Sequence, residues 1–312
     1  VSLRVVRFSL LFVFAQCLCV TARLPALSPS LSMAPISAVS PASWEGFDEG
    51  IVKIGSALGP AGAPFSEAPF SEATFSYCTA EFPFAVLVAD LFRDLVPELR
   101  LPLEDIHGSD KSAASRLRRM LRTASDREHK RKTVKAFGDL WREFVRRVIL
   151  PHLGEEWVAF EREPNIRVHF ARQKATTAPH CDSDHFHSPF EVNFWIPVVD
   201  VDGAASLWAE SSPGAGDFHP FAARYGEAVR FYGNACQHFT VDNSTRRTRV
   251  SFDARVIRGR DVARARLPEG GVVRGPRWLT DGAARFTLFG YYGVMAADGE
   301  LDAAACRRRG LP

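Results

Sequence analysis

The chain is poor in cysteine and contains no C-x-x-C pair. Six of its 312 residues are cysteine, and two of these fall within the first 22 residues. The other four are scattered, at Cys78, Cys181, Cys236 and Cys306. Four scattered thiols in a chain of this length do not make a disulfide framework. Cys181 and Cys236 could approach each other in space, but we interpret these two as small buried apolar side chains.

The chain also lacks an apolar run that would comfortably span a membrane. Its N-terminal run, Phe8–Val20, is too short for such a span. Arg4 and Arg7 precede the run and small residues end it at Ala22, which is the three-part pattern of a secretory signal. We therefore predict a leader over residues 1–22 that directs the chain to the secretory pathway or to a plastid.

The residues after this leader are rich in serine and proline. Residues 23–43 contain one arginine and no acid, which is typical of a flexible linker or of the transit half of a two-part organelle address. We predict a Ser/Pro/Ala-rich linker of little order over residues 23–80, and we interpret its partly repeated stretch "PFSEAPFSEATFSYC" as a duplication in a surface loop. Translation from Met33 would instead remove the leader and leave the protein in the cytoplasm.

Charge of neither sign dominates, since the formal net charge is +3. The charges are nevertheless segregated: Trp44–Asp105 holds eleven acids and three bases, whereas Lys111–Arg147 holds thirteen bases and four acids. A basic helical face of this kind could bind nucleic acid, but the acidic segment is an intramolecular partner and no aromatic residues interleave with the arginines. We expect no nucleic-acid partner.

Helical periodicity marks the first part of the folded chain, residues 81–153. The run "FAVLVADLFRDLV" predicts one apolar helix, and Ser112–Ala124 predicts a basic one. Apolar residues at three- and four-residue steps from Val134 to Ile149 predict a third helix, which we expect Pro151 to end. These helices are predicted to support a β-rich core.

The hydrophobic period changes to two from Ile166 onward. Six short β-rich runs follow: "IRVHFARQ", "FEVNFWIPVV", "ASLWAES", "EAVRFYG", "QHFTV" and "TRVSFDARVI". Because no helix-length gap separates them, we predict an antiparallel sandwich or barrel over residues 165–257. Residues 258–312 form a C-terminal extension, predicted to be irregular up to a last strand or docking segment in "RFTLFGYYGVM". Residues 81–312 together are predicted to be a single catalytic domain.

Three histidines and two aspartates fall within residues 180–187, "HCDSDHFH". His180 and Asp182 are two residues apart, so in an extended chain both side chains leave the same face. Two ligands from one strand and a histidine from a distant strand would bind one side of a metal and leave the other side open. This arrangement is the two-histidine, one-carboxylate triad of non-haem Fe(II) oxygenases.

The third ligand is predicted to be His238, which lies 56 residues past Asp182. Arg249 and Ser251 follow on the next predicted strand, after a turn at Asn243. A guanidinium offers two parallel donors to a carboxylate, and the hydroxyl two residues later faces the same way. This pair suits the distal carboxylate of 2-oxoglutarate.

The order of H-x-D, distal His and R-x-S on a β-rich domain resembles the Fe(II)/2-oxoglutarate dioxygenases. The stretches "PHCDSDHFH", "GNACQHFTVDNSTRRTRVSFDARVI" and "FTLFGYY" are similar to the streptomycin-biosynthesis hydroxylase-like branch, which is related to the phytanoyl-CoA dioxygenases. The resemblance spans roughly residues 167–292. It implies a mainly β fold with a helical N-terminal part, namely a double-stranded β-helix (a jelly-roll, cupin-like barrel) flanked by α-helices.

The same resemblance assigns roles to the motif residues. It implies that His180, Asp182 and His238 hold Fe(II), and that Arg249 and Ser251 hold 2-oxoglutarate. Dioxygen is the second cosubstrate. We therefore expect a hydroxylase that acts on an unactivated C–H bond of a small organic or natural-product-like molecule and releases succinate and CO2. The sequence names neither the substrate nor the oligomeric state.

Further residues are candidates for the walls of the site. We predict that Asn193 contacts 2-oxoglutarate or substrate, because a catalytic barrel has polar groups near its metal. The predicted substrate-pocket residues are His185, His187, Glu191, Trp195, Trp208, Glu210 and Tyr232. Core packing or a solvated face is the alternative for them. Arg255 could bind substrate or form a surface ion pair, and we favour the ion pair. His169 is predicted to be a core histidine and His219 to lie in a turn.

Two other classes of protein remain open. His185, His187 and Glu191 read H-x-H-x-x-x-E, and with His238 they resemble the four-ligand site of cupins on the same kind of barrel. The glycines that flank the cupin motif are missing, and that site would leave Arg249 without a role. The second alternative is a β-sandwich binding module without catalytic activity.

Overall fold

The computed structural model describes residues 70–99, 102–109, 112–117, 132–265, 267 and 286–311. All structural findings below concern this part of the chain. The predicted leader, most of the predicted linker and the second half of the basic helix lie outside it. Residues 112–117, where that basic helix was predicted to begin, are helical.

The described elements begin with β1 and end with α6. Besides the helix at residues 112–117, the described helices are α1 (Phe84–Leu95), η4 (Leu103–Gly108), α3 (Lys132–Phe144), η6 (Val145–Ile149), α4 (Leu150–Leu153), η7 (Asp182–His185), η8 (Gly203–Ala205), α5 (Gly259–Ala265) and α6 (Ala303–Arg308). The strands are β1 (Ala73–Ser76), β2 (Trp157–Glu161), β3 (Asn165–His169), β4 (Glu191–Pro197), β5 (Trp208–Ala209), β6 (His219–Pro220), β7 (Glu227–Phe231), β8 (His238–Phe239), β9 (Arg249–Arg258), β10 (Tyr292–Ala296) and β11 (Gly299–Leu301).

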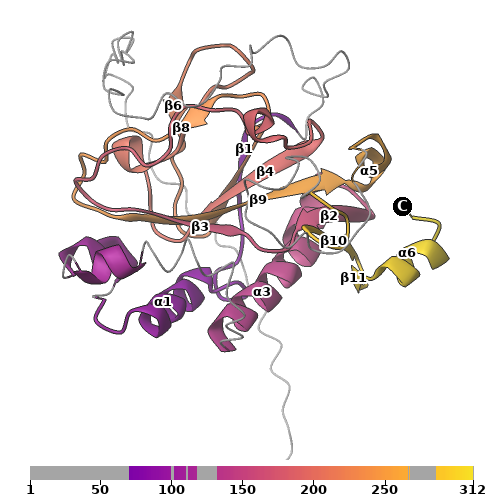
Figure 1. The fold of residues 1–312 in the computed structure, drawn as a ribbon, viewed down its shortest axis with the longest axis horizontal. Coiled ribbons are helices and arrows are strands. Elements are labelled where there is room, and N and C mark those ends of the chain that lie inside the picture. Colours follow the sequence, from indigo (N-terminus) through magenta and orange to yellow (C-terminus); the bar gives the residue numbers. More distant parts are fainter. Residues whose placement is uncertain are drawn as a thin grey trace, which may run out of the picture. The chain divides into compact units, whose positions relative to one another are not determined.

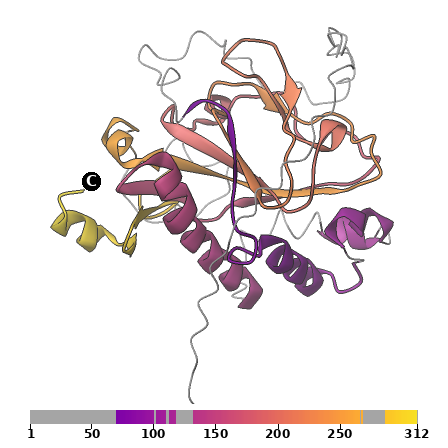
Figure 2. The same ribbon diagram turned by 180° about the vertical axis from the view of Figure 1, so that it is seen from behind.

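Antiparallel strands form two sheets. The larger has the order β1-β7-β4-β9-β2-β10-β11, with β3 also paired to β9, and the smaller has the order β6-β5-β8. Helices α1 and α3 lie on one side of the large sheet, and β6 and β8 lie on its other side (Figures 1 and 2). The predicted class, mainly antiparallel β structure with a helical N-terminal part, is confirmed.

Strand β9 separates an apolar face from a polar one. Its even-numbered residue Phe252 packs on the helices, with ring centroids 4.8 Å from Phe84 of α1 and 5.3 Å from Phe137 of α3. The odd-numbered residues from Arg249 to Arg255 leave the opposite face. This alternation places a row of polar side chains toward the interior between the two sheets, where the site lies.

The third predicted helix extends further than expected. Pro151 does not end it, because α4 continues to Leu153 and the chain leaves the helix at Gly154, in the left-handed region at φ 64°. A π turn, η6, precedes the proline, and the Leu150 N–H bonds to the Val145 carbonyl five residues back. The changed hydrogen-bond register at this turn lets the helix accommodate a residue without an N–H.

Three elements differ from the predictions. The surface loop expected over the repeated stretch contains β1, which pairs with β7 as the edge of the large sheet, and Phe70 there is fully buried. Strand β2 comes directly after the helices, before the predicted β region, and pairs with both β9 and β10. The tail is helical at α5 rather than irregular, and its predicted last strand is present as β10.

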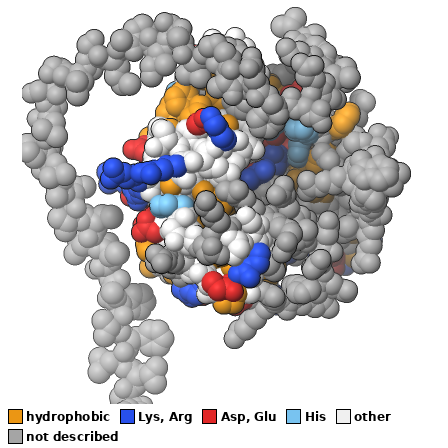
Figure 3. Space-filling view, turned by 60° about the vertical axis from the view of Figure 1, so that its left-hand side comes forward, with side chains coloured by type: hydrophobic (Ala, Val, Ile, Leu, Met, Phe, Trp, Pro, Cys, Tyr) orange, Lys and Arg blue, Asp and Glu red, His pale blue; other side chains and the backbone are white. Residues whose placement is uncertain are grey.

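Charged side chains of both signs are interspersed on the face drawn in Figure 3. Arg116 pairs with Glu98 at 2.6 Å, and Arg147 pairs with Glu81. Two arginines of the basic segment therefore form ion pairs with glutamates of the acidic segment. Of the helices described, none combines the length and the apolar character that crossing a membrane would need.

Candidate metal centre

The fold brings His180, Asp182 and His238 together. Backbone hydrogen bonds in both directions join His180 to His238 on β8, with N···O distances of 3.2 and 2.9 Å. The Nε2 atoms of the two histidines lie 3.9 and 3.7 Å from Oδ1 of Asp182. Within the described ranges this is the one group of three or more such side chains placed to hold a metal ion, with all ligand atoms within 4.8 Å of one another.

Backbone carbonyls fix which ring nitrogen of each histidine is available. Nδ1 of His180 lies 2.8 Å from the Ala178 carbonyl, and Nδ1 of His238 lies 3.1 Å from the Cys236 carbonyl. A carbonyl can only accept, so each Nδ1 donates and each Nε2 keeps a lone pair directed at Asp182. Burial and the neighbouring His238 lower the pKa of His180. His180 therefore favours the neutral form that binds a metal.

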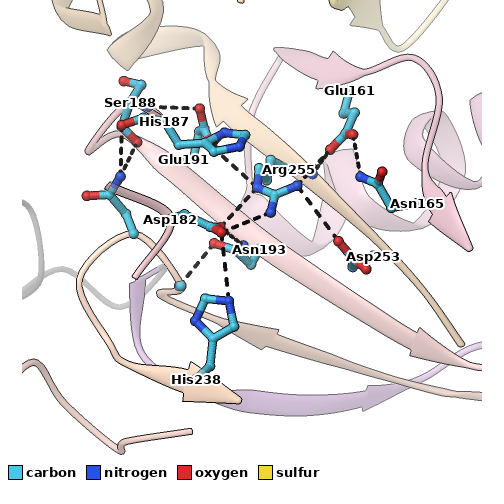
Figure 4. Close-up of polar contacts among 12 residues, drawn as sticks. Glu161, Asn165, Asp182, His187, Ser188, Glu191, Asn193, His238, Asp253 and Arg255 are labelled. Atoms are coloured by element: carbon cyan, nitrogen blue, oxygen red, sulfur yellow. Dashed lines mark hydrogen bonds and ion pairs between the residues drawn. The ribbon is translucent and has the colours of Figure 1, made fainter. Parts of the chain in front are cut away.

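Asp182 is held from two strands of the large sheet (Figure 4). Nδ2 of Asn193 on β4 donates to Oδ2 at 2.6 Å. Arg255 on β9 donates from Nε to Oδ2 at 2.9 Å and from Nη2 to Oδ1 at 3.0 Å. Burial opposes ionisation of Asp182, but Arg255 outweighs burial and holds the pKa of this carboxyl well below its usual range. Asp182 is thus an ionised carboxylate in a fixed orientation.

The predicted surface ion pair of Arg255 is wrong. Arg255 is 7% exposed, and besides Asp182 its guanidinium contacts Glu161, at 3.4 Å between Nη1 and Oε2. Oε2 of Glu191 lies 3.7 Å from Nε. The alternation R-x-S-x-D-x-R already places Arg255 on the same face as Arg249, but strand periodicity alone does not tell which face is the interior. Sequence reasoning missed Glu161 entirely, because β2 itself was not predicted.

Arg249 and Ser251 lie on the interior face of β9, as the motif predicted. Arg249 is 3% exposed and Ser251 is fully buried. Among the described residues, none forms a hydrogen bond with Nε of Arg249 or Oγ of Ser251. Burial and the nearby Arg167 lower the pKa of Arg249 to about 10. A buried cation and a buried hydroxyl therefore sit side by side, and no residue in the described part of the chain bonds to these two atoms.

Asn193 lies beside Asp182 and uses both of its amide atoms within the protein. Its Nδ2 is used by Asp182, and its Oδ1 accepts from the Gly233 N–H at 3.0 Å. His169 is fully buried, with Nε2 3.1 Å from the Lys174 carbonyl, as expected of a core histidine.

Two of the predicted pocket residues belong to the network around Arg255. Nδ1 of His187 lies 2.8 Å from Oε2 of Glu191, and the hydroxyl of Tyr292 donates to Oε1. Glu191 is 1% exposed, so these contacts lie in the interior. The ring of His185 lies 5.3 Å from the ring of His180, and this side chain is exposed beside the metal cluster.

Strand pairing places Trp208 away from the metal cluster. Trp208 pairs with Phe239 in register, whereas its neighbour Ala209 pairs with His238. Adjacent residues of a strand face opposite sides, so the Trp208 side chain leaves the face opposite that of His238. Glu210 is also occupied, since its carboxylate accepts from the backbone N–H groups of Gly214, Gly216 and Gln237.

The remaining two pocket candidates are core residues. Trp195 is 1% exposed, and its ring packs 5.8 Å from Phe221. Tyr232 is 2% exposed and donates to the Pro189 carbonyl at 2.9 Å. His219, predicted in a turn, lies on β6 with Nε2 2.8 Å from a carboxylate oxygen of Glu72.

The four-ligand cupin set does not assemble in the described structure. His238 belongs to the metal-binding geometry, but His185, His187 and Glu191 do not. Glu191 is instead directed at Tyr292 and Arg255. The metal-binding set in the described interior is therefore the triad of His180, Asp182 and His238.

No protein-family model matches the chain. The chain is 33% identical over 176 residues to the streptomycin biosynthesis protein StrG of Streptomyces griseus, across 55% of this chain and 79% of that protein.

Solved structures with similar folds are more distant. The nickel complex of the non-haem monooxygenase ThoJ is 15% identical at a TM-score of 0.37, over 77% of this chain and 91% of that one. The non-haem α-ketoglutarate-dependent epimerase SnoN from nogalamycin biosynthesis is 15% identical at a TM-score of 0.37, over 71% and 92%. At TM-scores below 0.5 these two likenesses carry no functional inference.

Proposed function

Because the chain belongs to the family of the streptomycin biosynthesis protein StrG, we propose that it is an oxygenase that uses Fe(II), 2-oxoglutarate and dioxygen. The observation that carries the proposal is the convergence of two imidazole Nε2 atoms and one carboxylate oxygen at His180, His238 and Asp182. We further propose that the two antiparallel sheets form a double-stranded β-helix around this cluster.

The donor set suits iron. Two neutral imidazoles and one carboxylate on one side of an ion are the ligands of non-haem Fe(II) oxygenases, which keep the other positions open. Each histidine is oriented by a backbone carbonyl and the aspartate by Arg255. Groups that hold the ligands in place before the metal arrives favour binding, since less order has to be created.

The interior also suits 2-oxoglutarate. The guanidinium of Arg249 is buried, and its Nε has no partner among the described residues. A buried cation is destabilising unless an anion pairs with it. A dicarboxylate would supply that anion at one end, with Ser251 adding a hydrogen bond, and would reach toward the metal with the other.

When bound, Fe(II) with 2-oxoglutarate supplies the oxidation of an unactivated C–H bond while 2-oxoglutarate is converted to succinate and CO2. The chain's own residues bind and orient. Asp182 and the two histidines hold the metal, and Arg249 and Ser251 hold the far carboxylate. Hydroxylation of a small organic or natural-product-like molecule is the outcome we propose, and the substrate approaches from the side of the exposed His185.

Metal content of matched variants tests the triad. We expect purified protein reconstituted with Fe(II) under anaerobic conditions to bind one metal ion per chain, and Asp182→Ala to bind none. Glu191→Gln, which removes the cupin-type carboxylate without changing its size, should keep the metal. Loss in the Glu191 variant alone would overturn the assignment of ligands.

Turnover tests the cosubstrate. We expect the iron-loaded protein to release succinate slowly from 2-oxoglutarate without added substrate, and Arg249→Met to abolish this release. A screen of metabolite extracts for a mass gain of one oxygen would then identify the substrate. Metal binding without any consumption of 2-oxoglutarate would favour a binding module that is not catalytic.

A further inference from the structure

Asp182 uses its two oxygens differently. Oδ2 accepts from Asn193 at 2.6 Å and from Nε of Arg255 at 2.9 Å. Oδ1 accepts one hydrogen bond, from Nη2 of Arg255 at 3.0 Å, and is the oxygen nearest to the Nε2 atoms of the two histidines. One oxygen is thus saturated inside the protein, and the other keeps a lone pair toward the metal cluster.

We propose that Arg255 is a positioning residue that makes Asp182 a one-oxygen metal ligand. This inference rests on the proposed function, since it takes Asp182 as a ligand. With Oδ2 held by Arg255 and Asn193, the carboxylate cannot rotate to offer both oxygens to the ion. A carboxylate that chelated through both oxygens would fill a fourth position.

By holding Asp182 as a one-oxygen ligand, Arg255 keeps coordination positions on the metal open. Three protein ligands would leave the other positions of the ion open for a 2-oxo acid and for dioxygen. Chelation by Asp182 would take up one of those positions. Arg255 therefore acts on cosubstrate binding through Asp182, without touching the cosubstrate itself.

Arg255 is itself rigidly placed. It pairs with Asn193 in register across β4 and β9, so the two donors to Asp182 lie side by side on adjacent strands. Behind it, Oε2 of Glu161 accepts from the Arg255 backbone N–H at 3.1 Å and lies 3.4 Å from Nη1. Asn165 holds the other oxygen of Glu161 at 2.9 Å. The guanidinium is fixed on both sides.

To position Asp182, the side chain needs the two parallel donors of a guanidinium and not only a positive charge. Nε and Nη2 are parallel donors that meet the two oxygens of one carboxylate, which a single ammonium cannot do. Arg255→Lys therefore keeps the positive charge among the buried acids but removes the bidentate hydrogen bond to Asp182. Arg258→Lys is a matched control, because Arg258 lies on the same strand, is 2% exposed and donates from Nε to Asp261 at 2.6 Å.

The test measures Co(II) binding by calorimetry and by the visible spectrum of the ion. We expect Arg255→Lys to bind Co(II) about 10- to 100-fold more weakly than the wild type. We also expect its spectrum to indicate a higher coordination number, and added 2-oxoglutarate to change that spectrum less. Arg258→Lys should match the wild type in affinity and spectrum, even if both variants lose stability.

The outcomes separate this inference from the proposed function. A wild-type protein that binds no Co(II), or an Asp182→Ala variant that binds it equally well, overturns both. Normal Asp182-dependent binding with an unchanged affinity and spectrum in Arg255→Lys overturns only the positioning role. If Arg255→Lys does not fold, Glu161→Gln decides, because it removes the negative charge that pairs with Arg255 and leaves the contacts of Arg255 with Asp182 in place: wild-type affinity and spectrum there overturn the inference.

Discussion

Gly233 approaches the side chain of Asn193 more closely than any other residue type could. A Cβ built on Gly233 would lie 2.7 Å from Nδ2 of Asn193, closer than real contacts allow. The Gly233 N–H donates to Oδ1 of Asn193, and its carbonyl accepts from the Asp182 N–H at 2.8 Å. One glycine thus contacts both Asp182 and the amide that holds Asp182.

Gly233→Ala should therefore disturb the metal centre. The new methyl group must displace the Asn193 amide, and we expect a loss of about 1–3 kcal/mol in the free energy of unfolding, together with weaker metal binding. Urea denaturation and metal titration measure the two effects. Gly108→Ala is the control, because a Cβ there meets nothing within 4 Å. Equal behaviour of the two variants would contradict the close packing at Gly233.

The metal cluster could be predicted because the patterns that indicate it each lie within a short segment of the sequence. The H-x-D spacing of His180 and Asp182 and the strand-like runs around His238 are properties of short segments. The spacing of residues in the sequence could not identify Arg255 as the residue that pairs with Asp182. Arg255 lies 73 residues away in sequence, and only the pairing of β4 with β9 brings it beside Asn193.

The errors in the fold have the same origin. The residues of β1 and β2 form short edge or connecting strands whose identity depends on their neighbours, β7 and β9. Isolated four- or five-residue apolar segments are ambiguous between loop, helix and strand. Trp208 was assigned to the pocket because aromatic residues often line sites, and only its register with Phe239 shows the opposite face.

Arg249 should destabilise the protein when no anion is bound. Its pKa is lowered to about 10 by burial and by Arg167, which means that the folded protein holds this charge at a cost. Replacing it with an apolar side chain of similar length removes that cost. We expect Arg249→Met to raise the free energy of unfolding by roughly 1–3 kcal/mol, measured by urea denaturation in buffer without dicarboxylates.

The same variant should lose its response to cosubstrate. A ligand that binds only the folded state raises the melting temperature, so 2-oxoglutarate should stabilise the metal-loaded wild type but not Arg249→Met. Succinate offers a second dicarboxylate for comparison. A variant that is less stable than the wild type in plain buffer, yet still stabilised by 2-oxoglutarate, would show that Arg249 is a structural residue.

Glu210 should organise a loop rather than bind substrate. Its carboxylate accepts from three backbone N–H groups, two of them in the loop at Gly214 and Gly216. Hydrogen bonds to a charged group each contribute about 1.5–3 kcal/mol. We expect Glu210→Leu to lower the free energy of unfolding by at least 2 kcal/mol and to speed amide exchange in residues 211–217, while metal affinity stays unchanged. A selective loss of substrate turnover in a fully stable variant would restore the pocket role.

His169 gives the protein a specific loss of stability in acid. The side chain is fully buried, and burial together with Arg249 lowers its pKa from 6.5 to about 4. Between these two values the unfolded chain takes up a proton that the folded protein does not, so the free energy of unfolding falls as the pH decreases from about 6.5 toward 4.

The expected contribution follows from the size of the shift. At pH 5 the difference between the two states amounts to about 2 kcal/mol, since one pKa unit corresponds to roughly 1.4 kcal/mol. His169→Gln keeps a donor for the Lys174 carbonyl but does not titrate. Urea denaturation at pH 7 and at pH 5 should therefore show a smaller decline for the variant than for the wild type. Parallel declines in the two proteins would mean that other groups govern the loss in acid and that His169 is protonated without penalty.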